Sequence, residues 1–237
     1  RDAQESRGLG DVYKRQEVEA VIHKALNYWF TAKPVCVNWW YNQIGIPKTL
    51  GTVFILFEKQ LTPVEKQNAI TVMENAKFGM TGQNKVWLAG NVMMRALLQN
   101  DYELVKMARD TIASEIVTGG AEGIKDDWCF HQHGAQQQFG NYGLSFVSGM
   151  SFFSGLFSGT SLAFDDKQLS ILSTLIDKGY RWVTWKGMMD VNALGRQLFH
   201  HAPVHKALSL AFAASELGGG ESDECVAVAL SLIHISE

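Results

Sequence analysis

The chain has 237 residues and a formal net charge of −3, with 46% hydrophobic and 19% charged residues. It is long enough to bury the core of one large domain, and its composition excludes an intrinsically disordered protein. The slight negative charge provides no broad basic field, so we expect no nucleic-acid partner, and an anionic ligand would need a local basic patch. The three cysteines, Cys36, Cys129 and Cys225, show neither a disulfide framework nor a paired zinc-ligand spacing.

The two ends of the chain differ from its middle. Residues 1–16 lack apolar periodicity, and residues 225–237 form a short apolar run that stops abruptly. Their sequences GDVYKRQ and SLIHISE resemble translated adapter sequence at the ends of assembled environmental reads. We therefore expect two non-native tails, a native protein that continues in both directions, and one domain over residues 17–224.

Four segments between these ends predict amphipathic helices. In residues 17–31, apolar side chains recur at the i, i+3, i+4 and i+7 spacing that places them on one helix face. The same pattern returns in three later segments, residues 101–116, 166–183 and 204–217. Asp101 stands where the N-cap of the second of these helices is expected. Polar, glycine-rich loops are expected between the helices, at residues 79–86, 118–127, 186–197 and 218–224.

Residues 143–164 contain no charged side chain and are long enough to span a bilayer. Two interpretations compete, a membrane helix and a helix buried on all sides. Serines and glycines lower the hydropathy of the segment, and no cluster of positive residues flanks it. We therefore expect a buried helix and no membrane partner. Because few segments alternate apolar and polar residues with period two, the sequence predicts an all-α domain of paired antiparallel helices.

Polar residues concentrate outside the predicted helices in five clusters, at residues 38–43, 81–85, 127–134, 136–143 and 190–196. The first cluster holds adjacent aromatic residues, which cannot all face one core because neighbours on a regular element diverge. Some of these rings should therefore be exposed or line a cleft.

Metal binding and glycoside hydrolysis are two other interpretations of these clusters, and the sequence favours them less. His131 and His133 could share a face of an extended strand and bind a metal ion, and His201 and His205 could share a helix face. However, no carboxylate or cysteine falls nearby at a familiar zinc spacing. Glycoside hydrolysis would need two carboxylates, and the candidates Asp126-Asp127, Asp165-Asp166 and Glu221 lie apart from the amide, histidine and tyrosine residues.

The clusters, taken in order, resemble polysaccharide lyase family 8, which contains the chondroitin AC, hyaluronate and xanthan lyases. The resemblance covers roughly residues 17–217. The matching stretches are NWWYNQIGIPKTLG (38–51), TGQNKVWLAGNVMMRALL (81–98), DWCFHQHGAQQQFGNYG (127–143) and NALGRQ (192–197). Several of them match at compatible spacing, which makes the combination more specific than any single motif.

The resemblance implies a set of site residues. The catalytic residues of the family fall on Asn84, His133, Tyr142 and Arg196, and its sugar-stacking tandem tryptophans fall on Trp39 and Trp40. His200 stands where members often carry a second arginine, which bears on substrate preference. A glutamate that the family brings into the cleft comes from a later β-sandwich domain, which this chain lacks.

These residue types suit β-elimination on a uronate. The C5 proton of a uronate lies α to a carboxylate, and Asn84 can hydrogen-bond the dianion that develops when this proton leaves. Tyr142 can abstract the proton, although a free phenol titrates near pH ~10, so a nearby Arg196 is needed to favour the phenolate. His133 can share the stabilising role or act as the base instead. The protonated Tyr142 can then protonate the departing O4, with no metal and no cofactor.

The resemblance also implies an incomplete α/α toroid followed by β-sandwich domains, and a secreted or periplasmic location. We expect an acidic polysaccharide as the partner and a monomer. An α/α-toroid glycoside hydrolase, a non-catalytic glycan-binding domain and a purely structural helical domain remain as alternatives. A spread of the four catalytic groups beyond about 12 Å would weaken the lyase interpretation.

Overall fold

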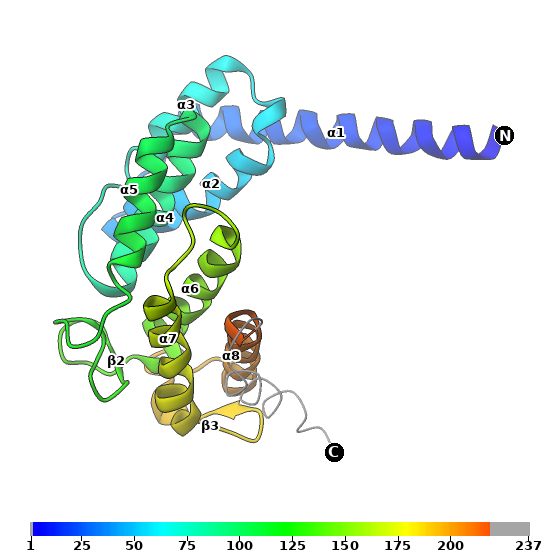
Figure 1. The fold of residues 1–237 in the computed structure, drawn as a ribbon. Helices are drawn as coiled ribbons and strands as arrows, with labels where there is room; N and C mark the ends of the chain where they lie inside the picture. Colours follow the sequence, from blue (N-terminus) through cyan, green and yellow to red (C-terminus); the bar gives the residue numbers. More distant parts are fainter. Residues whose placement is uncertain (1, 219–237) are drawn as a thin grey trace. The chain divides into compact units, whose positions relative to one another are not determined.

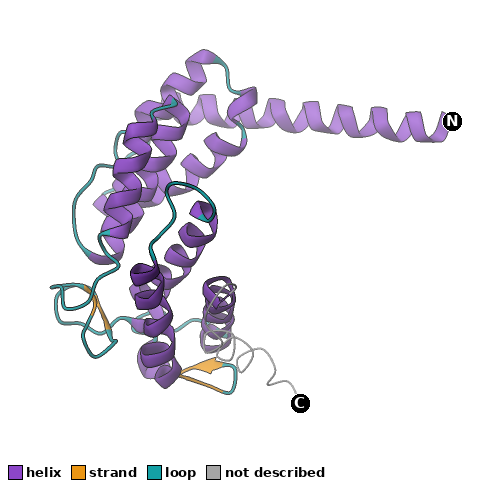
Figure 2. Ribbon diagram, in the orientation of Figure 1, coloured by secondary structure: helices purple, strands orange, loops and turns teal. Residues whose placement is uncertain are grey.

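The computed structural model describes the backbone of residues 2–218 and the side chains of residues 14–217. The described chain is mostly helical (Figures 1 and 2), which confirms the expected all-α class. Its strands form two small antiparallel hairpins, β1 (Gly123–Ile124) with β2 (Phe130–His131) and β3 (Thr184–Trp185) with β4 (Met188–Met189). The segment 225–237, expected to be a tail, lies outside the described residues.

The chain divides into two compact units. Unit 1 consists of residues 1–77 and 91–105, and unit 2 consists of residues 78–90 and 106–237. The boundary therefore falls within two helices, α4 (Gly82–Gln99) and α5 (Tyr102–Ala113), each of which contributes residues to both units.

Unit 1 is built on α1 (Asp2–Ala32), α2 (Ile46–Leu56), α3 (Pro63–Met73) and the second half of α4. A π-helical turn (Tyr41–Gly45) precedes α2, and a short 3-10 helix (Glu58–Gln60) follows it. The helix expected at residues 17–31 lies inside α1, which begins earlier. These helices share one apolar core, whose buried members are Leu26, Phe30, Phe54, Phe57, Ala69, Met73 and Leu98.

A buried carboxylate joins α1 to α3 within this unit. Thr62 and Glu65 form a capping box at the start of α3, each side chain accepting a backbone N–H of the other residue. Glu65, only 3% exposed, also accepts hydrogen bonds from His23 at 2.9 Å and from Asn27 at 3.0 Å, both on α1. Burial alone would raise the pKa of this carboxyl, but the hydrogen bonds from Thr62 and His23 outweigh it and lower the pKa below its usual 4.5.

Unit 2 contains the first half of α4, most of α5, α6 (Leu144–Phe157), α7 (Asp166–Thr174) and α8 (Ala202–Gly218). A π-helical turn (Leu175–Gly179) and a 3-10 helix (Tyr180–Val183) continue α7 to the end of the segment predicted at 166–183. The predictions at 101–116 and 204–217 correspond to α5 and α8. The Asp101 carboxylate accepts the Leu104 N–H at 2.9 Å, as expected for an N-cap.

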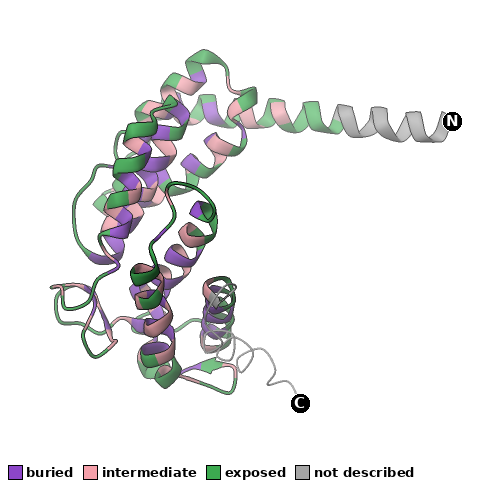
Figure 3. Ribbon diagram, in the orientation of Figure 1, coloured by how far each residue is buried: buried purple, intermediate pink, exposed green. Residues whose placement is uncertain are grey.

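Residues 144–157 of the uncharged segment 143–164 form α6, but the expectation of a helix that is buried on all sides is wrong. Phe146 and Met150 are fully buried, whereas Phe152 is 62% exposed and Leu156 is also exposed. Figure 3 shows buried and exposed residues side by side along the helices. Within the described part of the chain, no helix combines the length and the hydropathy needed to cross a membrane.

Candidate active site

Asn84 occupies the first turn of a long helix. The expected loop at 79–86 is too long, because α4 begins at Gly82. Gly82 has φ +58°, a conformation that side chains oppose, and a Cβ on it would meet the Gln132 side chain, so glycine is favoured where the helix starts. Asn84 is 6% exposed, and its Oδ1 finds no hydrogen-bond partner among the described residues. The unpaired Oδ1 is an acceptor and calls for a donor, whereas the NH₂ group of the same amide can donate to an anion at this helix N-terminus, where the dipole favours negative charge.

Two further predicted residues meet in unit 2. Tyr142 lies in a π-helical turn (Phe139–Gly143) that leads into α6, and its side chain is 7% exposed. Its hydroxyl is 3.0 Å from the His133 Nε2, and the two rings are edge to face with centroids 5.0 Å apart. His133 adopts the left-handed backbone conformation, with φ +60°, which is uncommon for a residue with a side chain. The expectation that these polar clusters lie outside helices is wrong for Asn84 and Tyr142.

A network of acceptors fastens the Asn84 turn to the His133 loop. The Glu122 carboxylate accepts the Thr81 hydroxyl at 2.5 Å and the Gly134 N–H at 3.0 Å, and it also accepts the Gln132 amide. The other end of the Gln132 amide accepts the Gln83 N–H at 2.8 Å. Gln132 and Gly134, on either side of His133, are therefore linked to Gln83 and Thr81, which lie close to Asn84 in the chain.

A second carboxylate supports the same helix start. Glu115 accepts the Gly82 N–H at 2.7 Å and forms an ion pair with Lys85 at 2.8 Å. Sequence reasoning missed Glu115, Glu122 and Gln132, because their partners lie between 10 and 51 residues away in the chain. No short motif carries that information.

Arg196 is exposed, in a loop that is fastened to the Tyr142 turn. The neighbouring Gln197 donates its amide to the Asn141 Oδ1 at 2.7 Å. The buried Lys206 of α8 donates to the Gly140 carbonyl and to the Gln197 Oε1, and its burial lowers its pKa from the usual 10.5. A Cβ on Gly140 would lie 2.7 Å from the Ala193 carbonyl, so the two segments are in close contact. The backbone on both sides of Arg196 is thus held near the turn that carries Tyr142, and Arg196 itself is exposed.

Trp39 and Trp40 belong to unit 1, where they begin the helical segment that leads into α2. Trp39 is 42% exposed, Tyr41 is also exposed, and the Trp40 and Tyr41 rings meet edge to face at 5.3 Å. The prediction that adjacent rings cannot all face the core is confirmed. The Asn42 side chain braces this segment by bonding the N–H and the carbonyl of Cys36 at 2.8 and 2.6 Å.

The metal interpretation gains no support from the described residues, in which no group of three or more histidine, cysteine, aspartate or glutamate side chains could hold an ion. The Asp127 carboxylate accepts the Cys129 N–H at 3.0 Å, which lowers the pKa of Asp127. The four residues predicted to be catalytic offer an amide, an imidazole, a phenol and a guanidinium.

Comparisons with known proteins agree with one another. A sequence model described as "Polysaccharide lyase family 8, N terminal alpha-helical domain" matches residues 6–215. Chondroitinase-AC of Pedobacter heparinus is 30% identical over 189 residues, which are 78% of this chain and 27% of that protein. Xanthan lyase of Bacillus sp. (strain GL1) is 28% identical over 167 residues, 68% of this chain and 18% of that protein.

A solved structure extends the likeness to three dimensions. The structure of a chondroitinase AC lyase, solved with oligosaccharide complexes, superposes with a TM-score of 0.78 and 26% sequence identity. The match covers 91% of this chain and 33% of that one. The chain thus spans about a third or less of the proteins that it matches.

Proposed function

This chain belongs to polysaccharide lyase family 8, and we propose that it carries the groups that catalyse β-elimination in a lyase acting on uronate-containing polysaccharide. The observation that supports this most strongly is the contact between the His133 Nε2 and the Tyr142 hydroxyl at 3.0 Å, in the unit that also holds the buried side chain of Asn84. Relatives named as chondroitin, hyaluronate and xanthan lyases support a substrate of the chondroitin or hyaluronan type.

Asn84 is proposed to hold the uronate carboxylate. Removal of the C5 proton moves negative charge onto this carboxylate, so groups that bind the dianion more strongly than the ground state accelerate the reaction. The Asn84 amide is buried and placed at the N-terminus of α4, whose dipole adds to the stabilisation of negative charge. The clamp at Glu122 keeps this turn in position without itself touching the sugar.

Tyr142 and His133 are proposed to move the proton. Tyr142 takes the C5 proton, the C5–H electron pair forms the C4–C5 double bond, and the C4–O4 bond breaks. The same hydroxyl then returns the proton to O4, so that atoms and charge balance. His133 orients the phenol through the 3.0 Å contact, and Arg196 stabilises the phenolate from the loop fastened beside it. The division of base duty between His133 and Tyr142 stays part of the proposal.

Trp39 and Trp40 are proposed to stack on the apolar faces of sugar rings, which the exposure of Trp39 supports. A polymeric substrate would have to be met outside the cell membrane, so we propose a secreted or periplasmic enzyme. We also propose that it acts as a monomer.

The chemical identity of the products tests the proposed reaction. This chain, and the longer protein expected to contain it, would be incubated with chondroitin sulfate and with hyaluronan, and the products weighed by mass spectrometry. Elimination predicts new ends that are lighter by one water than hydrolysis products, because they carry the double bond. New ends that are fully hydrated would show a hydrolase, and binding without cleavage by the longer protein would show a glycan-binding domain.

A further inference from the structure

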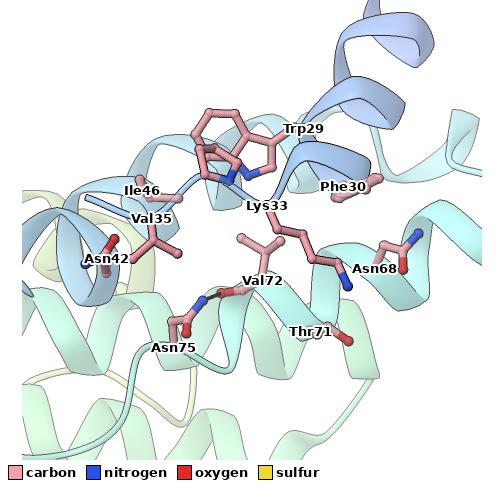
Figure 4. Close-up of a pocket in the computed structure, with 11 residues that line it drawn as sticks. Trp29, Phe30, Lys33, Val35, Asn42, Ile46, Asn68, Thr71, Val72 and Asn75 are labelled. Atoms are coloured by element: carbon pink, nitrogen blue, oxygen red, sulfur yellow. Dashed lines mark hydrogen bonds between the residues drawn. The ribbon is translucent and has the colours of Figure 1, made fainter. Parts of the chain in front are cut away.

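A pocket of about 310 Å³ lies wholly within unit 1. Its polar and aromatic lining comes from three parts of that unit, the end of α1, the turn before α2 and the last turns of α3. The members that carry the argument are Trp29, Lys33, Asn68, Thr71 and Asn75. Figure 4 shows the Lys33 side chain extending from the end of α1 toward residues of α3. None of the four groups proposed for the elimination lines this pocket.

The lining has the chemistry of a site for an acidic sugar. Lys33 is its one charged residue, and no carboxylate lines it, so the pocket favours an anion. Trp29 provides an aromatic wall, on which the apolar face of a sugar ring can stack. Asn75 donates its amide to the Val72 carbonyl at 3.1 Å, whereas the hydrogen bonds among residues 14–217 leave the Asn68 amide free for hydroxyl groups. The Thr71 hydroxyl donates to the Gln67 carbonyl at 3.1 Å, so its oxygen can accept from a sugar hydroxyl.

The backbone of Lys33 gives a second, independent observation. Lys33 follows the last residue of α1 and has φ +44°, and its N–H bonds the Trp29 carbonyl at 2.9 Å. Glycine is the usual residue at this left-handed position, because it has no Cβ to oppose the conformation. The local fold therefore favours glycine, whereas an anionic ligand in the pocket favours lysine. A cation near a helix C-terminus also interacts with the helix dipole, so the experiment must separate these two roles.

We propose that this pocket binds a single uronate unit, with Trp29 stacking on the ring, Asn68 and Thr71 bonding its hydroxyls, and Lys33 pairing with its carboxylate. The volume is at the lower end of ligand pockets, about 300–1,000 Å³, which suits one sugar ring and not a longer oligosaccharide. The site goes beyond the proposed elimination and does not depend on it.

The proposal is tested by titrating the 237-residue chain with sodium glucuronate and following the indole N–H of Trp29 by NMR. A ligand of this size is expected to bind with a Kd on the order of 1 mM. Glucose supplies the ring without the charge, and acetate supplies the charge without the ring. Glucuronate should bind more tightly than either.

The Lys33→Gly variant distinguishes a loss of glucuronate binding from a loss of folding. It should weaken glucuronate binding about fivefold, as expected for the loss of one partly exposed ion pair. At the same time the Tm should rise by roughly 1–4 °C, because glycine relieves the left-handed conformation. A loss of binding in a variant that is more stable than the parent cannot be attributed to unfolding.

Asn100→Gly is the matched control, since Asn100 is in the same unit and has φ +55° but does not line the pocket. It should leave glucuronate binding unchanged. The proposal is overturned by equal binding of glucose, by equal binding of acetate, by an unshifted Trp29 signal or by unchanged affinity in Lys33→Gly. Each of these outcomes leaves the product analysis of the elimination unaffected.

Discussion

Glu122 connects the segment that carries Asn84 to the segment that carries His133, and Glu122→Gln tests whether this connection holds the site together. One carboxylate oxygen accepts the Gly134 N–H at 3.0 Å, and the other accepts the Thr81 hydroxyl and the Gln132 amide. A glutamine keeps one acceptor oxygen and presents an NH₂ group in place of the other. At least one of the three donors would then face the NH₂ group of the glutamine and lose its acceptor.

The expected size of the effect follows from this count. A hydrogen bond to a charged group contributes about 1.5–3 kcal/mol, and the partial exposure of Glu122 places the loss at the low end, about 1–2 kcal/mol. If that free energy is needed to hold His133 and Asn84 in the reactive arrangement, kcat falls roughly 5–30-fold. The KM for a long polymer should change little, because Trp39 and Trp40 are untouched.

The assay is steady-state kinetics of double-bond formation by the longer protein expected to contain this chain, with chondroitin sulfate. Glu74→Gln is the control, since it makes the same chemical change at an exposed position of unit 1. A Glu122→Gln enzyme with kcat within twofold of the parent would refute the clamp. The clamp would also be refuted if the fall in kcat were fully explained by a smaller folded fraction of the variant. Glu122 would then have only a structural role.

Three further outcomes are expected. Glu65→Gln should lower the free energy of unfolding by about 2 kcal/mol at neutral pH. Because folding lowers the pKa of Glu65, the carboxylate stabilises the fold above pH 4.5, and this stabilisation is lost as the pH falls through the folded-state pKa. The difference in unfolding free energy between variant and parent, measured by chemical denaturation, should therefore shrink in acid. Trp39→Ala should raise KM for polymer several-fold but change it little for a disaccharide, and equal changes would contradict stacking. Lys206→Met should lower kcat by loosening the Gln197 loop beside Arg196, and unchanged kcat would contradict that link.

The sequence predicted the helices whose apolar residues keep a strict period. Those at 17–31, 101–116 and 204–217 are such cases, and the Asp101 cap was readable from one residue. The helix α2 is harder to predict, because its polar residues Lys48, Thr49 and Thr52 all lie in its first seven residues and the rest of it is apolar. The start of α3 did carry a signal, Thr62 followed three residues later by Glu65, which is the capping-box pattern.

The candidate site was predictable only in part. Motif order identified His133 and Tyr142, and the structure brings their side chains into contact. The start of α4 was misjudged, because Gly82 and the polar residues after it read as a loop, whereas acceptors from Glu115 and Gln132 satisfy its first N–H groups. Those acceptors come from distant parts of the chain, so no local pattern reveals them. The π-helical turn that holds Tyr142 likewise depends on tertiary contacts, such as the one between Gly140 and Ala193.

Tyr142, paired with His133, is proposed to carry the proton in the elimination. The most direct test is the rate of C4–C5 double-bond formation, followed by ultraviolet absorbance, for Tyr142→Phe against the parent in the longer protein. The mutation removes one hydroxyl and keeps the ring, so the packing of the π-helical turn should survive. If Tyr142 carries the proton, the rate should fall at least about 100-fold. A rate within a few-fold of the parent would contradict it.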